Sequence, residues 1–448
     1  MTDAPQRLRA VAELLATIYP GSRAVIAPSH RLRARDTDVA SPTTPAASPA
    51  TPKSTAREFL VLPSRTRPRL LVPADLPRAD RSHVIRAALQ RVSAVDGRRE
   101  VAARRGVGVL ASGPLGPLLF STTARVAPVD DRSVEAYLAR VVGCELRLSV
   151  QVGAERANAK PVLGVYRAAG GVELGFAKVG SSALAGRLVA SESATLTRLA
   201  AVRLSALEIP PVLHTGRWQG AEVLLLATVR GSRGADRGLP YDAMREVATV
   251  GGTHDVLLRD SPWVRSLRAR ITVAGGMHAD SLNTLLDALV SRDGDRRLTH
   301  GTWHGDWGPW NMAWSGARPV VWDWERCADE VPVGFDAVHF VAHQQLRRVD
   351  EMGVALDALT GRAGTAVAAL LAPWVPAPDR DIAARAVVDA YLLEIACRFA
   401  GDAAEVATAP VERLATWYLR VAAERLAVRP GVPPLQVRET AEPPGRRV

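Results

Sequence analysis

The chain has 448 residues, of which 47% are hydrophobic and 23% are charged. This length suits two or three domains, and the composition is that of a globular protein with a sizeable core. It excludes a wholly disordered chain, a fibrous chain and a small disulfide scaffold. No stretch reaches eighteen consecutive apolar residues, so no membrane partner is expected. The first residues carry charges inside an apolar stripe, which indicates an amphipathic helix and not a signal peptide.

The net charge is +11, and all but three of the 57 basic residues are arginine. No run of five or more Lys or Arg occurs, so the charge does not favour nucleic-acid binding and is expected on solvated faces. The three lysines are Lys53, Lys160 and Lys178. The three cysteines are widely spaced and odd in number, which favours a reducing compartment, the cytoplasm.

Residues 1–142 are predicted to form an α+β accessory region. Its helical patterns and strands are expected at 6–18, 58–64, 67–75, 79–93 and 132–142. Residues 36–55 are rich in Pro, Ser, Thr and Ala, which predicts a flexible loop or linker. Residues 106–111 match G-x-G-x-x-A, but charged helical residues precede them instead of a strand, so they do not indicate a dinucleotide site.

Residues 143–231 are predicted to form a small lobe of antiparallel strands with one helix. The strands are expected at 145–153, 161–168, 172–180 and 221–229, and the helix at 183–201. Residues 232–430 are mostly helical in pattern, apart from a dense motif near residues 299–325. The tail, 431–448, is rich in Pro and is predicted to be disordered.

The segment 299–325 carries most of the chemical information. His304, Gly305 and Asp306 are followed, five residues after the aspartate, by Asn311. Residues 311–314 and 319–322 are short apolar strands joined by a turn, and Asp323 follows directly. Such a hairpin places Asn311 beside Asp323, with Asp306 in the loop that leads into it. Two carboxylates and an amide therefore converge.

Phosphoryl transfer requires such a set of groups. One carboxylate orients the attacking hydroxyl and accepts its proton, while a second carboxylate and an amide oxygen hold Mg²⁺, a cation that prefers oxygen ligands. The spacing from Asp306 to Asn311 equals that in the protein-kinase motif H-R-D-x-x-x-x-N, with Gly305 in place of Arg.

The segments HGDWGPWN and VVWDWE resemble those of the aminoglycoside phosphotransferase and choline kinase superfamily, which comprises small-molecule kinases. The resemblance covers roughly residues 144–427. It implies a bilobal protein-kinase-like α+β fold, with a small antiparallel β lobe, a larger helical lobe and, in this chain, the α+β accessory region before them. It also implies that Asp306 is the catalytic base, that Asn311 and Asp323 are Mg²⁺ ligands, and that His304 braces the loop.

The upstream half can be compared with the same fold. A kinase needs a lysine on its third strand, paired with a glutamate on the next helix. Lys178 lies on the third predicted strand, and Glu192 follows fourteen residues later in the predicted helix. The backbone from Ala227 to Val229 is expected to meet the adenine edge of the nucleotide. The loop 153–160, which would cover the phosphates, contains one glycine where a protein kinase has three.

Other polar residues near the motif allow further interpretations. The spacing of His300 with His304, and of His339 with His343, suits two zinc ligands on a helix, but the glutamate of H-E-x-x-H is missing, so we do not predict zinc. Glu325 is expected to brace the loop, since Asp323 already fills the ligand position. The neighbouring carboxylates Asp329, Glu330 and Asp336 are either plain surface or part of a site for a cationic acceptor.

Six of the ten tryptophans fall between residues 303 and 324. Most are expected to pack in a core, while Trp307 or Trp310 is a candidate to stack on a sugar or an aromatic acceptor.

The sequence thus predicts transfer of the γ-phosphate of ATP or GTP, with Mg²⁺, to a hydroxyl of a small molecule. An aminoglycoside, a sugar or amino sugar, and an alcohol such as choline all remain open as acceptors. A pseudokinase that acts as a nucleotide-binding scaffold is the alternative, although a degraded kinase usually lacks one of the four key groups. The role of residues 1–142 and the oligomeric state stay open.

Overall fold

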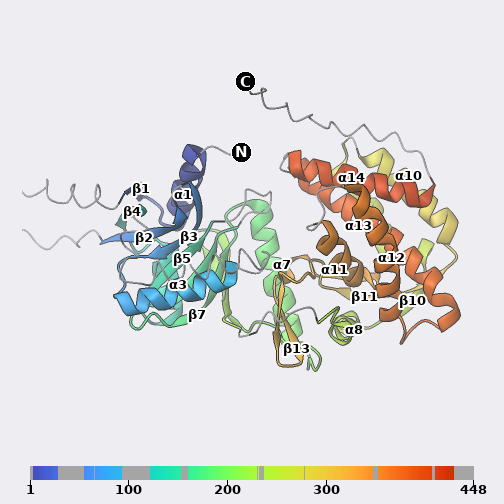
Figure 1. Ribbon diagram of the computed structural model, residues 1–448, viewed down its shortest axis with the longest axis horizontal. Helices are drawn as coiled ribbons and strands as arrows, with labels where there is room; N and C mark the ends of the chain where they lie inside the picture. The colour runs from blue at the N-terminus through green and yellow to red at the C-terminus, as the bar shows by residue number, and fades with distance from the viewer. Residues whose placement is uncertain are drawn as a thin grey trace, which may run out of the picture. The chain divides into compact units, whose positions relative to one another are not determined.

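The computed structural model describes residues 4–28, 55–64, 66–92, 122–152, 160–229, 231, 237–276, 278–346, 352–405 and 409–427. The chain divides into two compact units, one made of residues 1–237 and 309–327, the other of 238–308 and 328–448 (Figure 1). The predicted loop at 36–54, the segment 106–111, the loop at 153–159 and the tail at 431–448 lie outside the described residues.

The first unit is built on a nine-stranded antiparallel sheet in the order β1-β4-β2-β3-β5-β6-β7-β9-β8. The strands are β1 (Arg23–Pro28), β2 (Thr55–Ser64), β3 (Arg67–Pro73), β4 (Thr122–Val129), β5 (Leu146–Gln151), β6 (Val162–Arg167), β7 (Glu173–Val179), β8 (Val212–Trp218) and β9 (Ala221–Ala227). The helices are α1 (Ala4–Ile18), α3 (Arg78–Val92), α6 (Val134–Val142) and α7 (Ala183–Ala200). The predicted helices and strands of this half are confirmed, whereas β1, β4 and β8 were not expected.

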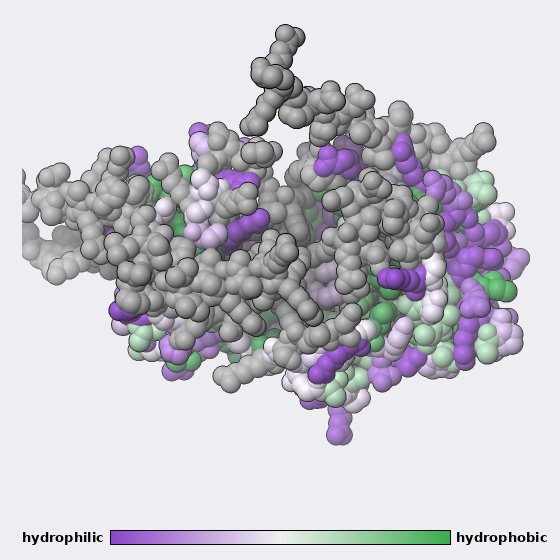
Figure 2. Space-filling view, in the orientation of Figure 1, coloured by the Kyte–Doolittle hydropathy of each residue, from purple (hydrophilic) through white to green (hydrophobic). Residues whose placement is uncertain are grey.

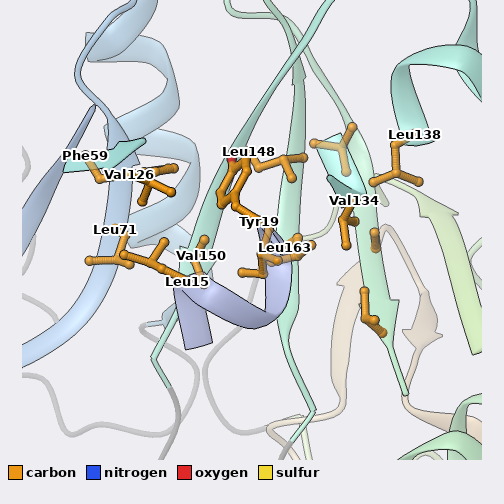
Figure 3. Close-up of a cluster of buried hydrophobic side chains, with 14 of the residues drawn as sticks. Leu15, Tyr19, Phe59, Leu71, Val126, Val134, Leu138, Leu148, Val150 and Leu163 are labelled. Carbon is orange, nitrogen blue, oxygen red and sulfur yellow. The ribbon is translucent and has the colours of Figure 1, made fainter. Parts of the chain in front are cut away.

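The boundary expected at residue 142 falls inside this sheet, because β3 pairs directly with β5, with Leu71 opposite Val150. One hydrophobic core also runs across the boundary. Figure 3 shows Leu15 of α1 and Tyr19, which directly follows this helix, beside Leu148 and Val150 of β5. The accessory strands extend the sheet because each buries one apolar face that would otherwise meet water.

A hairpin from a later part of the chain also belongs to the first unit. It consists of β12 (Met312–Ser315) and β13 (Arg318–Val321), and the short 3₁₀ helix η2 (Trp324–Arg326) follows. The backbone of Glu208 ties it in place: its N–H donates to Pro319 O at 2.8 Å, and its carbonyl accepts from Val321 N at 2.9 Å. The Glu208 carboxylate also pairs with Arg318 at 2.6 Å. These bonds explain why residues 309–327 group with the strand-rich unit. The sequence pattern had placed them in the helical lobe instead.

The second unit is mainly helical, as predicted. Its helices are α8 (Tyr241–Thr249), α9 (Pro262–Ala274), α10 (Ala279–Asp293), α11 (Phe335–Leu346), α12 (Met352–Leu370), α13 (Arg380–Glu405) and α14 (Ala409–Leu426), with 3₁₀ turns η1 (Leu258–Asp260) and η3 (Ala377–Asp379). A three-stranded sheet, β10 (His254–Leu257), β11 (Arg297–Trp303) and β14 (Ala328–Pro332), was not expected. The α+β class is confirmed, with a strand-rich and a helix-rich unit.

None of the described helices is both long and apolar enough to cross a membrane. Figure 2 shows hydrophilic side chains gathered over the α10 side of the helical unit, with hydrophobic surface only in small separate areas. The few large hydrophobic residues that are exposed include Val172 and Val273, far apart in the chain. Isolated exposures of this kind are normal in globular proteins.

Candidate active site

Lys178 lies on β7, an inner strand of the nine-stranded sheet, opposite Val162 on β6 and Leu224 on β9. Its side chain is buried, and its ammonium group donates to both oxygens of Glu192, at 2.6 and 2.5 Å, and to Asp323 Oδ1, at 2.7 Å. Burial alone would lower the pKa of Lys178, but the carboxylates of Asp323 and Glu192 outweigh it, so the pKa is raised. The lysine therefore stays charged.

Glu192 occupies a core-facing position of α7, in the same stripe as Leu188, Val189 and Leu196. Ser182 caps the N-terminus of the helix, because its side chain accepts from Ala185 N at 3.1 Å. The carboxylate of Glu192 is fully buried, and a buried charge is costly unless it is paired. Lys178 supplies that pair, and removal of either partner from such a buried pair typically costs about 3–5 kcal/mol. The predicted Lys178–Glu192 contact is present.

Asp323 ends the hairpin in an unusual backbone conformation, with φ of 71°. Non-glycine residues rarely adopt this left-handed region, which aspartate tolerates better than most. The bend turns the chain from β13 into η2, where Trp324 is fully buried and donates through its indole to Val321 O at 2.9 Å. The anchored bend delivers the Asp323 carboxylate to Lys178.

Asn311 immediately precedes β12, and its side chain is buried. Its carbonyl accepts from Trp322 N at 3.0 Å, and the next pair in the register is Met312 with Val321. Asn311 therefore lies opposite Trp322, one residue from Asp323, which is the neighbourhood that the hairpin predicted.

Lys160 is a site residue that the sequence analysis listed but did not assign. It lies just before β6, its side chain is 9% exposed, and its ammonium group contacts Glu325 and lies 3.5 Å from Asp323. Burial, and then the positive charge of Lys178, lower the pKa of Lys160. Its rarity in an arginine-dominated chain was the available signal, and it applied to Lys160 as much as to Lys178.

Three carboxylates of the first unit form the group best suited to a metal ion among the described residues. Glu192, Asp323 and Glu325 each offer an oxygen, and these atoms all lie within 4.8 Å of one another. Such hard oxygen donors suit Mg²⁺. The residues present therefore fit a magnesium ion, with Asp323 the most exposed of the three. No histidine belongs to this group, so it does not resemble a zinc site.

The segment from Ala227 to Val229 ends β9. The N–H of Ala227 donates to Pro211 O at 2.9 Å, and that of Thr228 donates to Leu174 O at 3.3 Å. These bonds hold the end of β9 between its neighbours. The N–H groups of Ala227 and Thr228 are therefore already engaged.

Asp306 belongs to the second unit, in the loop that follows β11. The loop is held at three points: Asp336 accepts from His304 N at 2.7 Å and from Gly305 N at 3.1 Å, Arg398 donates to Gly305 O at 2.7 Å, and Asp306 N donates to His304 Nδ1 at 3.1 Å. Gly305 has φ of 87°, which a glycine adopts at little cost, and this explains why it replaces the arginine of the kinase motif. His304 braces the loop, as the resemblance implied.

Asp336 is buried, and both of its carboxylate oxygens accept hydrogen bonds from N–H groups of this loop. It is therefore neither plain surface nor open to a cationic acceptor. Burial raises its pKa to about 7, although the N–H groups of His304 and Gly305 oppose the shift. Trp307 is also fully buried, with its ring centroid 5.7 Å from that of His304. It is therefore a core residue, and it does not offer a face for stacking. Trp310 is only half-buried.

The carboxylate of Asp306 has a histidine partner that the sequence analysis missed. His339 on α11 is buried, and its Nε2 lies 3.0 Å from Asp306 Oδ1. The hydroxyl of Tyr391 on α13 lies 2.9 Å from the other ring nitrogen, Nδ1. Burial raises the pKa of Tyr391 well above its ordinary value, so the phenol keeps its proton. Because the phenol donates to Nδ1, that nitrogen is the acceptor, so Nε2 carries the ring hydrogen and donates a hydrogen bond to Asp306 Oδ1.

The predicted site residues are thus distributed between the two units. The first holds Lys178, Glu192 and Asp323 in direct contact, with Asn311 adjacent and the end of β9 on the same sheet. The second holds Asp306. Lys160 and His339 are additions that the structure reveals.

No protein-family model matches the sequence, and no curated protein matches it. Solved structures do show similar folds. A thermostable mutant of aminoglycoside phosphotransferase APH(4)-Ia is 15% identical, with 66% of this chain and 98% of that chain covered and a TM-score of 0.44. An ethanolamine kinase from Plasmodium vivax is 9% identical, with 76% and 94% covered and a TM-score of 0.44.

Proposed function

We propose that this chain is a small-molecule kinase that transfers the γ-phosphate of ATP or GTP to a hydroxyl group. The observation that carries the proposal is the buried contact of Lys178 with both Glu192 and Asp323. Phosphoryl transfer by protein kinases requires a strand lysine paired with a helix glutamate, and an aspartate that holds Mg²⁺. None of the three cysteines forms a disulfide, which suits a reducing compartment, so we place the reaction in the cytoplasm.

On the nucleotide side, Lys178 binds phosphate oxygens, and Glu192 keeps its side chain extended along the sheet. Asp323 and Asn311 are the proposed Mg²⁺ ligands. When bound, the metal ion neutralises charge on the transferring phosphoryl group. The backbone near Val229, together with the carbonyl of Ala227, binds the adenine or guanine edge.

On the acceptor side, Asp306 accepts the proton of the attacking hydroxyl. The bonds from Asp336 and Arg398 hold its loop, and His339 holds its carboxylate. Five positions separate Asp306 from Asn311, so their Cα atoms are at most about 18 Å apart in any conformation. The base and the metal ligands are therefore linked by a short tether.

The scaffold alternative is not favoured. A degraded kinase would lack the lysine, the base or a metal ligand, but Lys178, Asp306, Asn311 and Asp323 are all present. Lys178 and Asp323 are also in contact.

The proposal is tested by transfer of labelled γ-phosphate from ATP, with Mg²⁺, into a small-metabolite extract of the host supplemented with aminoglycosides. Wild type and Asp306→Asn run side by side. A labelled product that forms only with wild type identifies the acceptor and supports the proposal. If Mg²⁺-dependent ATP binding is measurable but neither protein forms a product, the scaffold alternative is favoured instead.

A further inference from the structure

Both lysines that the structure describes lie at the same carboxylate cluster. The chain has 57 basic residues and only three lysines, of which Lys53 lies outside the described residues. Lys160 and Lys178 both contact Asp323 within 4.0 Å. Lysine offers a compact point charge, whereas arginine offers a wide planar fork. In a chain that otherwise uses arginine, two neighbouring lysines indicate that this position needs compact cations.

Burying the charged ammonium group of Lys160 costs free energy, which indicates that Lys160 is not an incidental surface residue. Its side chain is 9% exposed, and the side chain of its partner Glu325 is 6% exposed. It also lies beside a like charge, Lys178, and both effects disfavour its ammonium form. Glu325 and Asp323 offset that cost in this state.

The charge balance shows what the second lysine is suited to. Glu192, Asp323 and Glu325 contribute three negative charges, and the two lysines contribute two positive charges. A metal ion that took its place among the carboxylates would compete with the two ammonium groups for the same oxygens. The polyphosphate of a nucleotide provides new oxygens for displaced ammonium groups. Lys178 contacts both oxygens of Glu192 in addition to Asp323, whereas Lys160 contacts Glu325 and Asp323, the proposed metal ligand.

We propose that Lys160 is a second phosphate-binding residue, whose ammonium group exchanges Glu325 for the phosphate oxygens of a metal-bound nucleoside triphosphate. This rests on the proposed kinase function. Glu325, once released, becomes available to the metal ion or to its water ligands.

The competing explanation is that Lys160 only holds Glu325 and Asp323 in place and never contacts phosphate. The two explanations predict different affinities for ligands with increasing numbers of phosphate groups. The experiment measures the affinity of wild type and Lys160→Gln for adenosine, ADP and ATP, each with Mg²⁺, by tryptophan fluorescence. A lost charged hydrogen bond corresponds to about a 10- to 100-fold weaker affinity for ATP. We expect a smaller loss for ADP and a change of less than about twofold for adenosine. Lys53→Gln, the same chemical change elsewhere, should leave all three affinities unaltered.

Chemical labelling of wild type gives a second measurement that does not depend on a variant that folds. With only three lysines, acetylation of each can be followed by mass spectrometry. MgATP should protect both Lys160 and Lys178 from acetylation, whereas adenosine with Mg²⁺ should not.

Equal losses for all three ligands in Lys160→Gln, or protection by MgATP of Lys178 alone, would overturn the role of Lys160 and leave the kinase proposal intact. Failure of wild type to bind either ATP or GTP would overturn both proposals.

Discussion

Asp323 and Asp306 are the two aspartates that the proposed reaction depends on, and their surroundings differ in kind. Their side chains are similarly exposed, at 27% and 35%, so burial does not distinguish them. Asp323 faces two ammonium groups, Lys178 and Lys160. Asp306 faces an imidazole, His339, that is itself held by Tyr391.

The difference in partners matches the difference in proposed roles. The ammonium groups beside Asp323 are compact point charges that, in the proposed reaction, exchange with a metal ion and phosphate. The ring of His339 is fixed from both of its nitrogens, so it can only hold the Asp306 carboxylate in one orientation. In the proposed reaction the oxygens of Asp323 must be released to the metal ion, whereas the carboxylate of Asp306 must keep its orientation towards the hydroxyl. Each prediction below tests one side of this contrast.

The largest expected effect separates nucleotide binding from turnover. Asp306→Asn should lower γ-phosphate turnover by about 10³-fold, because a positioned base contributes about 10²–10⁴-fold. Its Kd for MgATP should stay within about threefold of wild type. Asp323→Ala should instead lose most of the Mg²⁺-dependent part of ATP binding, since it removes a ligand of the ion. Titration of ATP with and without Mg²⁺, followed by single-turnover kinetics, measures both. A weakened Kd in Asp306→Asn would contradict the division of roles.

Substitution of His339 tests whether its hydrogen bond, and not its volume, supports the base. His339→Phe keeps a ring and removes the donor, whereas His339→Gln keeps an N–H near the Nε2 position and removes the ring. We expect kcat to fall about 30-fold in His339→Phe and about fivefold or less in His339→Gln, since a hydrogen bond to a charged group contributes about 1.5–3 kcal/mol. KM for ATP should not change in either. If His339→Phe were the more active variant, packing and not positioning would explain the residue.

The strand that leads to Asp306 should be sensitive to acid. His300 on β11 is fully buried, and burial lowers its pKa to about 4. Between this value and the ordinary value near 6.5 the unfolded chain binds the proton more tightly, so stability falls as the pH drops. From pH 7.5 to pH 5 the loss from this one residue is about 2 kcal/mol. Urea unfolding of wild type and His300→Asn at both pH values measures it, because the variant should lack this part of the loss.

Near Asp323, the pH dependence of stability that Lys178 contributes has the opposite sign to that of His300. The raised pKa of Lys178 means that its contribution to stability is complete below the unfolded value near 10.5 and is lost only as the pH rises through the higher folded value. Acid that destabilises β11 should therefore leave the charge of Lys178 unaltered. A loss of stability in acid that was the same in wild type and in His300→Asn would show that other groups dominate.

Local patterns predicted the elements that carry the first set of groups. Strands β5, β6 and β7 alternate or are apolar and are separated by clear turn signals, and α7 has a regular apolar stripe, so Lys178 and Glu192 could be paired from sequence. β11 was missed because it is buried along almost its whole length and contains Thr, His and Gly, with no alternation. β10 and β14 are short and polar, and they become strands only by pairing with β11.

The partners that complete the two sites could not be predicted in the same way. Lys178 and Asp323 are 145 residues apart, and although the kinase motif assigned a role to each, it did not predict their direct contact. His339 and Tyr391 lie 33 and 85 residues after Asp306 and belong to no such motif. The i, i+4 spacing of His339 and His343 is instead typical of two metal ligands on a helix. Only the packing of α11 against α13 brings the imidazole between the carboxylate and the phenol.

The smallest expected effect concerns Tyr391, which lies one step further from the base. Tyr391→Phe removes the hydroxyl that bonds His339 Nδ1 and keeps the ring that packs edge-on against Phe335, at 5.8 Å between centroids. The His339 ring remains held by Asp306 at its other nitrogen, so kcat should fall by only about threefold, with KM for ATP unchanged. Kinetics of the double variant with His339→Phe provide the decisive comparison. If Tyr391 acts through His339, its substitution has no further effect once the imidazole is gone, and the two losses are not additive. Additive losses would mean that Tyr391 supports the site by another route, and the chain of contacts from phenol to imidazole to carboxylate would then describe geometry without function.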